Sequence, residues 1–408
     1  MKYLILVGDG MGDRPIAELG GRTPLQAAAT PAMDALSRRG TPLRVATVPD
    51  GFHPGSDVAN MSLLGYDPAR YYTGRAPLEA ASMGITLAED EIAFRCNLVT
   101  TTAGPDHTRA MVDFSAGHIS NDEAAQLIEA LQQACGNEHF RFHAGISYRH
   151  LLVVKEAIAL PTTVPPHDYI GKDVSDAWQA YLAIPAWDQL VRTAETILAD
   201  HPVNRRRKAD GKHRATAIWP WGMGKTPTMP TLRERFNITG TMISAVDLLN
   251  GLGVCAGLTI TRVPGATGYI DTNYEGKAQA ALTALEQQDF VFVHLEAPDE
   301  AGHQGRLDHK LQAIEDFDAK IVAPIVATLR QRGEPFRVIV TMDHFTPLAI
   351  QTHTADPVPA ILYDSRETEP GSNRPFDEQL SAATGNPGDP LPLLPGHQMI
   401  ELLLTKHP

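Results

Sequence analysis

Three short hydrophobic runs mark the chain: YLILV at 3–7, FVFVHL at 290–295 and FRVIV at 336–340. Their nearly continuous hydrophobicity is typical of strands in a parallel sheet that is covered on both faces. The stretch 307–333 places apolar residues at helical spacing and stops at Gly333, so it predicts a helical crossover between two of these strands. The pattern as a whole therefore predicts a doubly wound α/β core.

The middle of the chain has a different pattern. Alternating stretches such as IAFRCNLVTT and HLLVVKEAIAL are typical of half-buried strands, and SNDEAAQLIEALQQACG predicts a helix. We interpret residues 75–215 as an inserted α+β domain, and residues 1–74 together with 216–408 as the core. The basic run NRRRKADGKHR at 204–214 favours a solvated loop, with attraction of an anion as the alternative.

Composition limits the class of protein. The 408 residues are 43% hydrophobic and 20% charged, as expected for a folded globular chain. The net charge of −13 disfavours a broad nucleic-acid surface, although it leaves room for a local basic patch around a phosphate. MKYLILV runs directly into GDGMGD and predicts a strand rather than a signal peptide, and no stretch is long and apolar enough to span a membrane.

Three cysteines, Cys96, Cys135 and Cys255, are an odd number without a Cys-x-x-Cys pair. This usage predicts a reducing, cytoplasmic compartment. The oligomeric state is left open by the sequence.

Acidic and histidine residues follow each of the three hydrophobic runs. Asp9 follows the first, Asp299 and His303 follow the second, and Asp343 and His344 follow the third. A single Asp in such a place is usually a turn former or a helix cap. Because the carboxyl ends of parallel strands meet at one edge of a sheet, however, we expect the whole set to converge on one cleft.

The spacing within this set is typical of metal ligands. Asp299 and His303 are four residues apart and would share one face of a helix, and His353 can join them from the following loop. The remaining strand-end residues form a second group. Two metal ions a few ångströms apart suit phosphoryl transfer, and oxygen and nitrogen donors without thiolate favour Mn²⁺, Mg²⁺ or Zn²⁺.

The stretch HPGSDVANMSLLGYDP at 53–68 predicts a short helix that begins near Ser56 and ends before Gly65. Serine is a favoured helix N-cap, and glycine is an ordinary helix stop. The pattern alone therefore favours a capping role for Ser56 and leaves a nucleophilic role as the alternative.

Two nucleotide-binding motifs are incomplete. GDGMGD carries Asp13 where the dinucleotide fingerprint requires glycine, and WGMGKT lacks the first glycine of a phosphate-binding loop, which falls on Trp219. Lys225 in the second motif is either a point charge for a phosphate or carboxylate or an ordinary surface lysine.

Several longer motifs occur in a familiar order between residue 1 and about residue 365. They are GDGMGDRP, PGSDVANMSLLGYDP, TGRAPLEAASMGI, VPGATGYIDTNYEGKA, HLEAPDEAGHQG, DHFTP and HTADPVPAIL. Together they resemble the cofactor-independent phosphoglycerate mutases of the archaeal type, which are alkaline phosphatase-like metalloenzymes. The resemblance implies an alkaline phosphatase-like doubly wound sheet with an inserted domain that holds the substrate. The implied reaction interconverts 3-phosphoglycerate and 2-phosphoglycerate.

The resemblance also implies the site. Ser56 would be phosphorylated during turnover, with two divalent ions, Mn²⁺ first and Mg²⁺, Co²⁺ or Zn²⁺ as alternatives, and without 2,3-bisphosphoglycerate. One ion would be held by Asp9, Ser56, Asp343 and His344, and the other by Asp299, His303 and His353. From the inserted domain and its return to the core, the candidates for substrate binding are Arg149, His150, His167, Asp168 and Lys225.

One departure and several alternatives accompany this reading. The family usually has a small residue on each side of the Asp-His pair, whereas this chain has Met342 and Phe345, which puts the shape of the pocket in doubt. A phosphatase or another phosphomutase, such as a phosphopentomutase, would use the same metal core. A phosphonopyruvate decarboxylase would not need a nucleophilic serine, and a non-catalytic binding protein would not need the complete ligand set.

Overall fold

The computed structural model describes residues 1–104, 108–367, 371, 373–381 and 391–405. The chain divides into two compact units, Met1–Tyr72 with Thr228–Pro408 and Thr73–Pro227. The second boundary differs from the expected one at residue 215. Residues 216–227 belong to the inserted unit because β7 (Ala217–Gly224) pairs with β3 (Glu91–Ala103) inside it.

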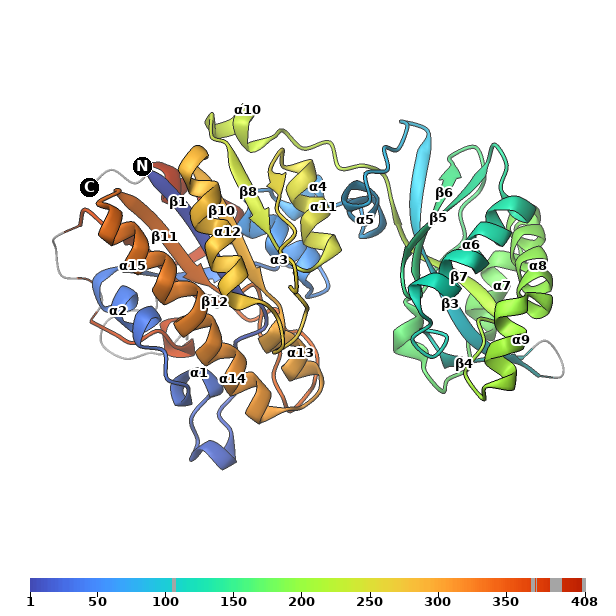
Figure 1. Cartoon of the computed structure of the whole chain (residues 1–408), viewed down its shortest axis with the longest axis horizontal. Coiled ribbons are helices and arrows are strands. Elements are labelled where there is room, and N and C mark those ends of the chain that lie inside the picture. The colour runs from blue at the N-terminus through green and yellow to red at the C-terminus, as the bar shows by residue number, and fades with distance from the viewer. Residues whose placement is uncertain (105–107, 368–370, 372, 382–390, 406–408) are drawn as a thin grey trace. The chain divides into compact units, whose positions relative to one another are not determined.

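The first unit is built on an eight-stranded sheet with the order β13-β2-β12-β11-β1-β10-β8-β9 (Figure 1). Its strands are β1 (Lys2–Gly8), β2 (Thr41–Ala46), β8 (Gly240–Ile243), β9 (Thr259–Ile260), β10 (Phe290–Leu295), β11 (Phe336–Thr341), β12 (Val358–Asp364) and β13 (Leu393–Pro395). The three predicted strands are confirmed as β1, β10 and β11, and β1 lies parallel to both of the others. β12 runs antiparallel to its two neighbours, so the sheet is mixed rather than wholly parallel.

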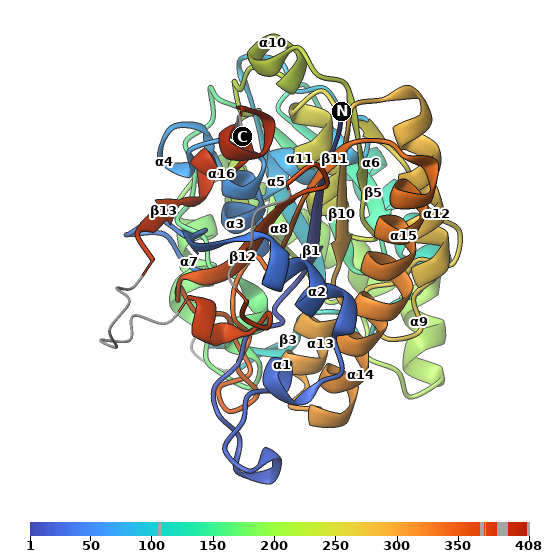
Figure 2. The same cartoon turned by 90° about the vertical axis from the view of Figure 1, so that its left-hand side faces the viewer.

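Helices cover both faces of this sheet, which explains why its central strands are continuously apolar. α12 (Tyr274–Gln287) and α15 (Ala323–Arg332) lie on one face, and α3 (Ser56–Leu63) and α11 (Asp247–Cys255) lie on the other (Figure 2). The predicted crossover at 307–333 is confirmed as α14 (Leu307–Phe317), a π-helical turn at Asp318–Val322 and then α15. It ends at Gly333, whose φ of 66° suits glycine.

Six further α-helices among the described residues complete the first unit. They are α1 (Pro24–Ala27), α2 (Pro31–Arg39), α4 (Pro68–Tyr71), α10 (Leu232–Phe236), α13 (Ala297–His303) and α16 (Met399–Thr405). Among the helices of the described residues, none has the length and apolar character needed to cross a membrane.

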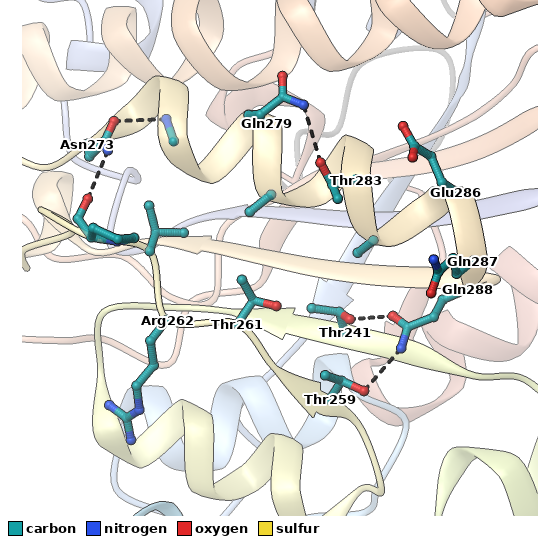
Figure 3. Close-up of a pocket in the computed structure, with 15 residues that line it drawn as sticks. Thr241, Thr259, Thr261, Arg262, Asn273, Gln279, Thr283, Glu286, Gln287 and Gln288 are labelled. Atoms are coloured by element: carbon teal, nitrogen blue, oxygen red, sulfur yellow. Dashed lines mark hydrogen bonds between the residues drawn. The ribbon is translucent and has the colours of Figure 1, made fainter.

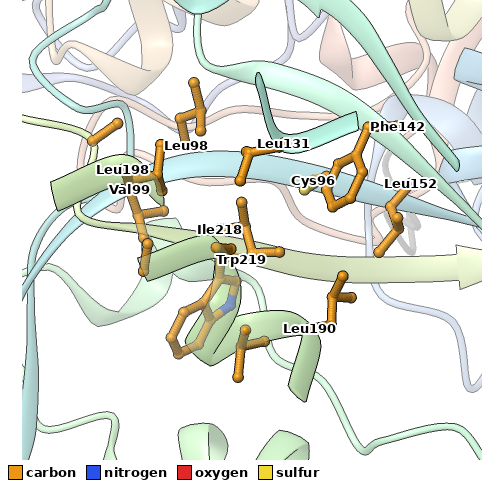
Figure 4. Packing of buried hydrophobic residues seen from close by; sticks show 14 of the residues in the cluster. Cys96, Leu98, Val99, Leu131, Phe142, Leu152, Leu190, Leu198, Ile218 and Trp219 are labelled. Carbon is orange, nitrogen blue, oxygen red and sulfur yellow. The ribbon is translucent and has the colours of Figure 1, made fainter. Parts of the chain in front are cut away.

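The inserted unit is an antiparallel sheet with helices, as expected for an α+β insertion. Its strand order is β4-β3-β6-β5, with β7 beside β3. The remaining strands are β4 (Arg109–Asp113), β5 (Phe140–Ile146) and β6 (Arg149–Lys155), and its helices are α5 (Ala76–Ser82), α6 (Asn121–Cys135), α7 (Ser175–Leu182), α8 (Pro185–Asp200) and α9 (Pro202–Ala209). Cys96 and Leu98 of β3 pack with Leu131 of α6 and Leu190 of α8 in a single apolar core (Figure 4).

The basic run at 204–214 is not a solvated loop, because its first half forms α9. Arg207 in this helix is buried and pairs with Glu123 at 2.6 Å. Its guanidinium also donates to the carbonyl oxygens of Ala116 and His213. This arginine therefore joins α9 to the neighbouring chain, which accounts for its burial.

Candidate metal centre

The acidic and histidine residues after three neighbouring strands come together at one edge of the sheet. β1 lies between β11 and β10, with Val7 opposite both Thr341 and His294, so the three strands end level with one another. Asp9 follows β1, Asp343 and His344 follow β11, and Asp299 lies in α13 after β10. The expected convergence is present in the structure.

Asp9 lies at the centre of one group. Its Oδ2 lies 3.1 Å from His294 Nε2, and its Oδ1 lies 3.4 Å from His344 Nε2. His344 Nε2 is also 3.4 Å from Asp343 Oδ2. Asp9, His294 and Asp343 offer ligand atoms that all lie within 4.8 Å of one another, as metal ligands require. His294 was missed by the sequence analysis, because it lies inside the hydrophobic run FVFVHL.

Asp299 lies at the centre of a second group. Its Oδ2 is 3.2 Å from His303 Nε2 on the same helix, and its Oδ1 is 3.3 Å from His353 Nε2. The two Nε2 atoms are 2.8 Å apart. Asp299 and His353 also group with His344 within 4.8 Å, so His344 faces both groups. The two groups are therefore contiguous.

Burial and mutual repulsion dominate the electrostatics. Burial, followed by the charges of Asp343 and Asp299, raises the pKa of Asp9 well above its usual range. Burial would also raise the pKa of Asp299, but hydrogen bonds from His303 and His353 hold it well below its usual value. Such a concentration of buried acid is costly unless cations offset it.

Unsatisfied atoms indicate where a cation fits. Among the described residues, Asp9 Oδ1 and His294 Nε2 are buried and have no hydrogen-bond partner. Buried polar atoms are normally paired, so these two atoms point to an additional ligand. Carboxylate and imidazole donors without thiolate fit a divalent cation such as Mn²⁺ or Zn²⁺.

Ser56 is the first residue of α3, but it does not cap the helix. Gly55 occupies the N-cap position, and no side chain caps this end. The favoured capping interpretation is therefore wrong, whereas the predicted start of the helix is correct. Ser56 Oγ turns toward the acidic group instead, 3.2 Å from His344 Nε2 and 3.5 Å from Asp9 Oδ2.

Asn60 fixes α3 against the strand ends. Its amide nitrogen donates to the carbonyl oxygen of Ser56 at 2.8 Å and to Asp343 Oδ2 at 2.9 Å. These two bonds hold the first turn of the helix beside the acidic group. The backbone N–H groups of a first helical turn have no partner within the helix, and they favour anions.

The large residues beside the Asp-His pair are both buried. Met342 is fully buried, and Phe345 is 4% exposed. The ring of Phe345 packs on Gly12, where an added Cβ would lie only 2.2 Å from the ring. Glycine at position 12 thus makes room for the phenylalanine, and both belong to the loops that carry Asp9 and Asp343.

The candidates for substrate binding all lie in the inserted unit, where they occupy different environments. Arg149 is exposed at the start of β6, with its guanidinium 5.6 Å from the centre of the Tyr148 ring. Lys225 pairs with Glu156 at 2.7 Å. His167 and Asp168 are exposed neighbours on a short 3₁₀ turn, 3.6 Å apart.

His150 differs from the other candidates because it is only 2% exposed. Its Nδ1 accepts a hydrogen bond from the Gly145 N–H at 3.0 Å, and burial lowers its pKa to about 3. A neutral, enclosed imidazole is a poor candidate for contact with an anionic substrate.

A groove of about 610 Å³ lies between α12 and the strands β8 and β9 (Figure 3). Many of its polar side chains bind one another: Thr241 donates to Gln288, Gln288 donates to Thr259, and Gln279 donates to Thr283. Its charged residues, Arg262 and Glu286, form ion pairs with Asp247 and Arg332. The candidate metal centre, rather than this groove, offers reactive groups.

Comparison with known proteins agrees with this geometry. Residues 38–204 match the family model of the 2,3-bisphosphoglycerate-independent phosphoglycerate mutases. A probable enzyme of that name from Geobacter sulfurreducens is 49% identical over 406 residues, covering 100% of both chains. The enzyme from Methanosarcina barkeri is 52% identical over 389 residues, covering 95% of this chain and 96% of the relative.

Solved structures show the same fold. The cofactor-independent phosphoglycerate mutase from Thermoplasma acidophilum has a TM-score of 0.63 at 27% identity and covers 99% of both chains. A protein from Pyrococcus horikoshii has a TM-score of 0.80 at 28% identity, covering 99% of this chain and 96% of its own. The sequence identity to these relatives is about one half over nearly the full length of the chain, and the fold is the same. The chain therefore belongs to the 2,3-bisphosphoglycerate-independent phosphoglycerate mutase family.

Proposed function

We propose that the protein interconverts 3-phosphoglycerate and 2-phosphoglycerate without 2,3-bisphosphoglycerate, through a phosphoserine at residue 56. The name shared by the full-length relatives supports the reaction. The phosphoserine route rests on one observation, the position of Ser56 Oγ beside Asp9 and His344 at the start of α3. A phosphoryl group there would face the free N–H groups of the first turn.

The two groups of donors would hold two divalent ions. One ion would be held by Asp9, Ser56, Asp343 and His344, and the other by Asp299, His303 and His353. When bound, such ions lower the pKa of a hydroxyl group and offset the negative charge of a phosphoryl group in transfer. We take Mn²⁺ as the first choice, ahead of Mg²⁺, Co²⁺ and Zn²⁺, since the donors are oxygen and nitrogen.

The reaction proceeds in two transfers at Ser56. Ser56 Oγ gives up its proton and forms a bond to phosphorus, while the bond between phosphorus and the C3 oxygen of the substrate breaks. That oxygen takes up a proton, and glycerate stays bound. The 2-hydroxyl of glycerate then loses its proton and attacks phospho-Ser56, which releases 2-phosphoglycerate and returns the serine hydroxyl.

Glycerate must be retained between the two transfers, and we assign that task to the inserted unit. Arg149 is the favoured contact for the carboxylate, because it forms no ion pair with a described residue and arginine binds carboxylates well. His167, Asp168 and Lys225 remain candidates, with Lys225 weakened by its pairing with Glu156. We place the reaction in the cytoplasm, which the three free cysteines support.

Acid quenching tests the phosphoserine route. Protein mixed with 3-phosphoglycerate and Mn²⁺ is quenched within one turnover, digested, and measured by mass spectrometry for phosphate on the peptide that carries Ser56. We expect a phosphopeptide that disappears when a chelator is added before the substrate. Turnover to 2-phosphoglycerate with no phosphopeptide at any quench time would exclude the route.

A further inference from the structure

His294 is a fully buried histidine at the end of β10, beside the metal centre. It comes from a strand that otherwise contains only apolar residues, and its backbone carbonyl accepts a hydrogen bond from the buried Lys277 Nζ at 2.8 Å. The family resemblance gives no role to this position. The reason for burying a histidine here must therefore be sought in the contacts of its imidazole ring.

The two ring nitrogens have different surroundings. Nδ1 lies 3.4 Å from Ser244 Oγ, and that oxygen is itself fixed by the Val246 N–H at 3.0 Å. Nε2 lies 3.1 Å from Asp9 Oδ2, yet it makes no hydrogen bond with any residue that the structure describes. One nitrogen is thus held by a neighbour while the other points into the acidic group.

This arrangement is the one that metal-bound histidines adopt. The nitrogen that is not bonded to the metal usually hydrogen-bonds to a neighbouring group, which fixes the orientation of the ring. Asp9 Oδ1 is also buried and has no hydrogen-bond partner among the described residues, and Asp9 belongs to the same group of ligand atoms within 4.8 Å. If His294 simply donated a hydrogen bond to Asp9, both of its ring nitrogens would have a partner. Nε2 has none in the described part of the chain, so such a bond does not account for the position of the ring.

We infer that His294 Nε2 is a ligand of the ion bound by Asp9 and Asp343. The inference rests on the proposed two-ion function and deepens it. With His294 and His344 both present, this site carries imidazole donors beside its carboxylates. Imidazole suits Zn²⁺, Co²⁺ and Mn²⁺ better than Mg²⁺, so the site discriminates against Mg²⁺.

A bond between the ring and the metal can be observed directly. Metal-free protein is loaded with ¹¹³Cd²⁺ as a probe, and proton–cadmium correlation spectra report which histidine rings are bonded to the ion. We expect signals from His294, His303, His344 and His353. His294→Gln and His294→Asn identify the His294 signal, and two variants are used so that the assignment does not depend on the folding of one.

His309 provides the control, because it contacts Tyr269 and Arg306 outside the two groups. His309→Gln should leave every cadmium-coupled signal unchanged. If the His294 ring shows no coupling to cadmium while the other three rings do, the inference is wrong. The proposed function would not be affected by that result. Loss of coupling at all four rings would instead remove the two-ion site itself.

Mn²⁺ titration of the metal-free protein gives a second readout that is independent of turnover. His294→Gln should lower the affinity of one of the two sites for Mn²⁺ by tenfold or more, and the affinity of the other site should stay near its wild-type value. The preference of that site for Mn²⁺ over Mg²⁺ should shrink in the same variant. Unchanged affinities for both ions would contradict the assignment.

Discussion

Ser56 lies in the first turn of α3 without capping it, so its removal should affect chemistry and stability very differently. Loss of a true serine cap costs about 0.5–2 kcal/mol. Because Gly55 is the N-cap here, Ser56→Ala should cost less than about 0.5 kcal/mol in urea unfolding. If Ser56 is the proposed nucleophile, turnover should also fall by at least about a thousandfold. A destabilised variant with most of its activity kept would restore the capping interpretation.

Glu378 should make the stability of the protein depend on pH. It is buried, accepts hydrogen bonds from Thr23 Oγ1 and the Asp13 N–H, and has its pKa raised by burial to about 7. The folded state therefore holds the proton more tightly than the unfolded state, where the pKa is 4.5. Its contribution to stability is full below pH 4.5 and is lost as pH rises through 7.

The effect of Glu378 can be isolated by substitution. Glu378→Gln keeps a neutral side chain at every pH, so the variant should gain stability relative to the wild type as pH rises from 4.5 to 8, by at most about 3 kcal/mol. Urea unfolding of both proteins across this range measures the difference. Parallel stability curves would show that the pKa of Glu378 is the same in the folded and unfolded states, so that burial does not raise it.

At the scale of elements, α14 joins the two loops that carry the proposed metal ligands Asp9 and Asp343. Lys310 on this helix is fully buried and donates to the carbonyl oxygens of Gly12 and Thr346 and to Asp13 Oδ2, at 2.8 to 3.1 Å. Thr346 in turn donates to Asp299. One ammonium group thus joins the loop after β1 to the loop after β11.

Removal of Lys310 should therefore be costly. Lys310→Met leaves the Asp13 carboxylate buried and unpaired, which typically costs 3–5 kcal/mol. Lys320→Met is the matched control, because Lys320 forms a partly exposed ion pair with Asp316, and a pair so near the surface is worth about 1 kcal/mol or less. Urea unfolding compares the two, and Asp13→Asn added to Lys310→Met should recover part of the loss. Equal costs for Lys310 and Lys320 would contradict this role.

Some elements could be predicted from local pattern and others could not. The runs 3–7, 290–295 and 336–340 could be predicted as strands because strands covered on both faces are apolar along most of their length. The antiparallel direction of β12 and the pairing of β7 with β3 depend on contacts between distant segments. No local pattern carries that information.

The same limit applied to the site. Asp9, Asp299 and Asp343 could be grouped because each lies within a few residues after a strand, whereas His294 lies inside one. A histidine within an otherwise apolar run, five residues before Asp299, is the signal that was available. The basic run 204–214 was wrongly predicted as a loop for a similar reason, since only the fold shows that the charge of Arg207 pairs with Glu123.

At the scale of the whole molecule, the proposed role of the inserted unit is to hold glycerate, which would make the protein a mutase rather than a phosphatase. If Arg149 holds the glycerate carboxylate, Arg149→Ala should raise KM for 3-phosphoglycerate by about 10- to 100-fold, as loss of one charge-assisted pair predicts. Lys225→Ala should act more weakly, because Lys225 already pairs with Glu156. Arg192→Ala, at an exposed pair with Asp188 on α8, is the control. Steady-state kinetics that show equal KM values for all three variants would remove Arg149 from the site.

The central claim is that phospho-Ser56 passes its phosphoryl group to retained glycerate rather than to water. The most direct measurement is the ratio of 2-phosphoglycerate to inorganic phosphate formed from 3-phosphoglycerate, with Mn²⁺ present and 2,3-bisphosphoglycerate absent. We expect a large excess of 2-phosphoglycerate and no requirement for the bisphosphate. An excess of inorganic phosphate would make the protein a phosphatase, and a strict requirement for the bisphosphate would contradict the phosphoserine route.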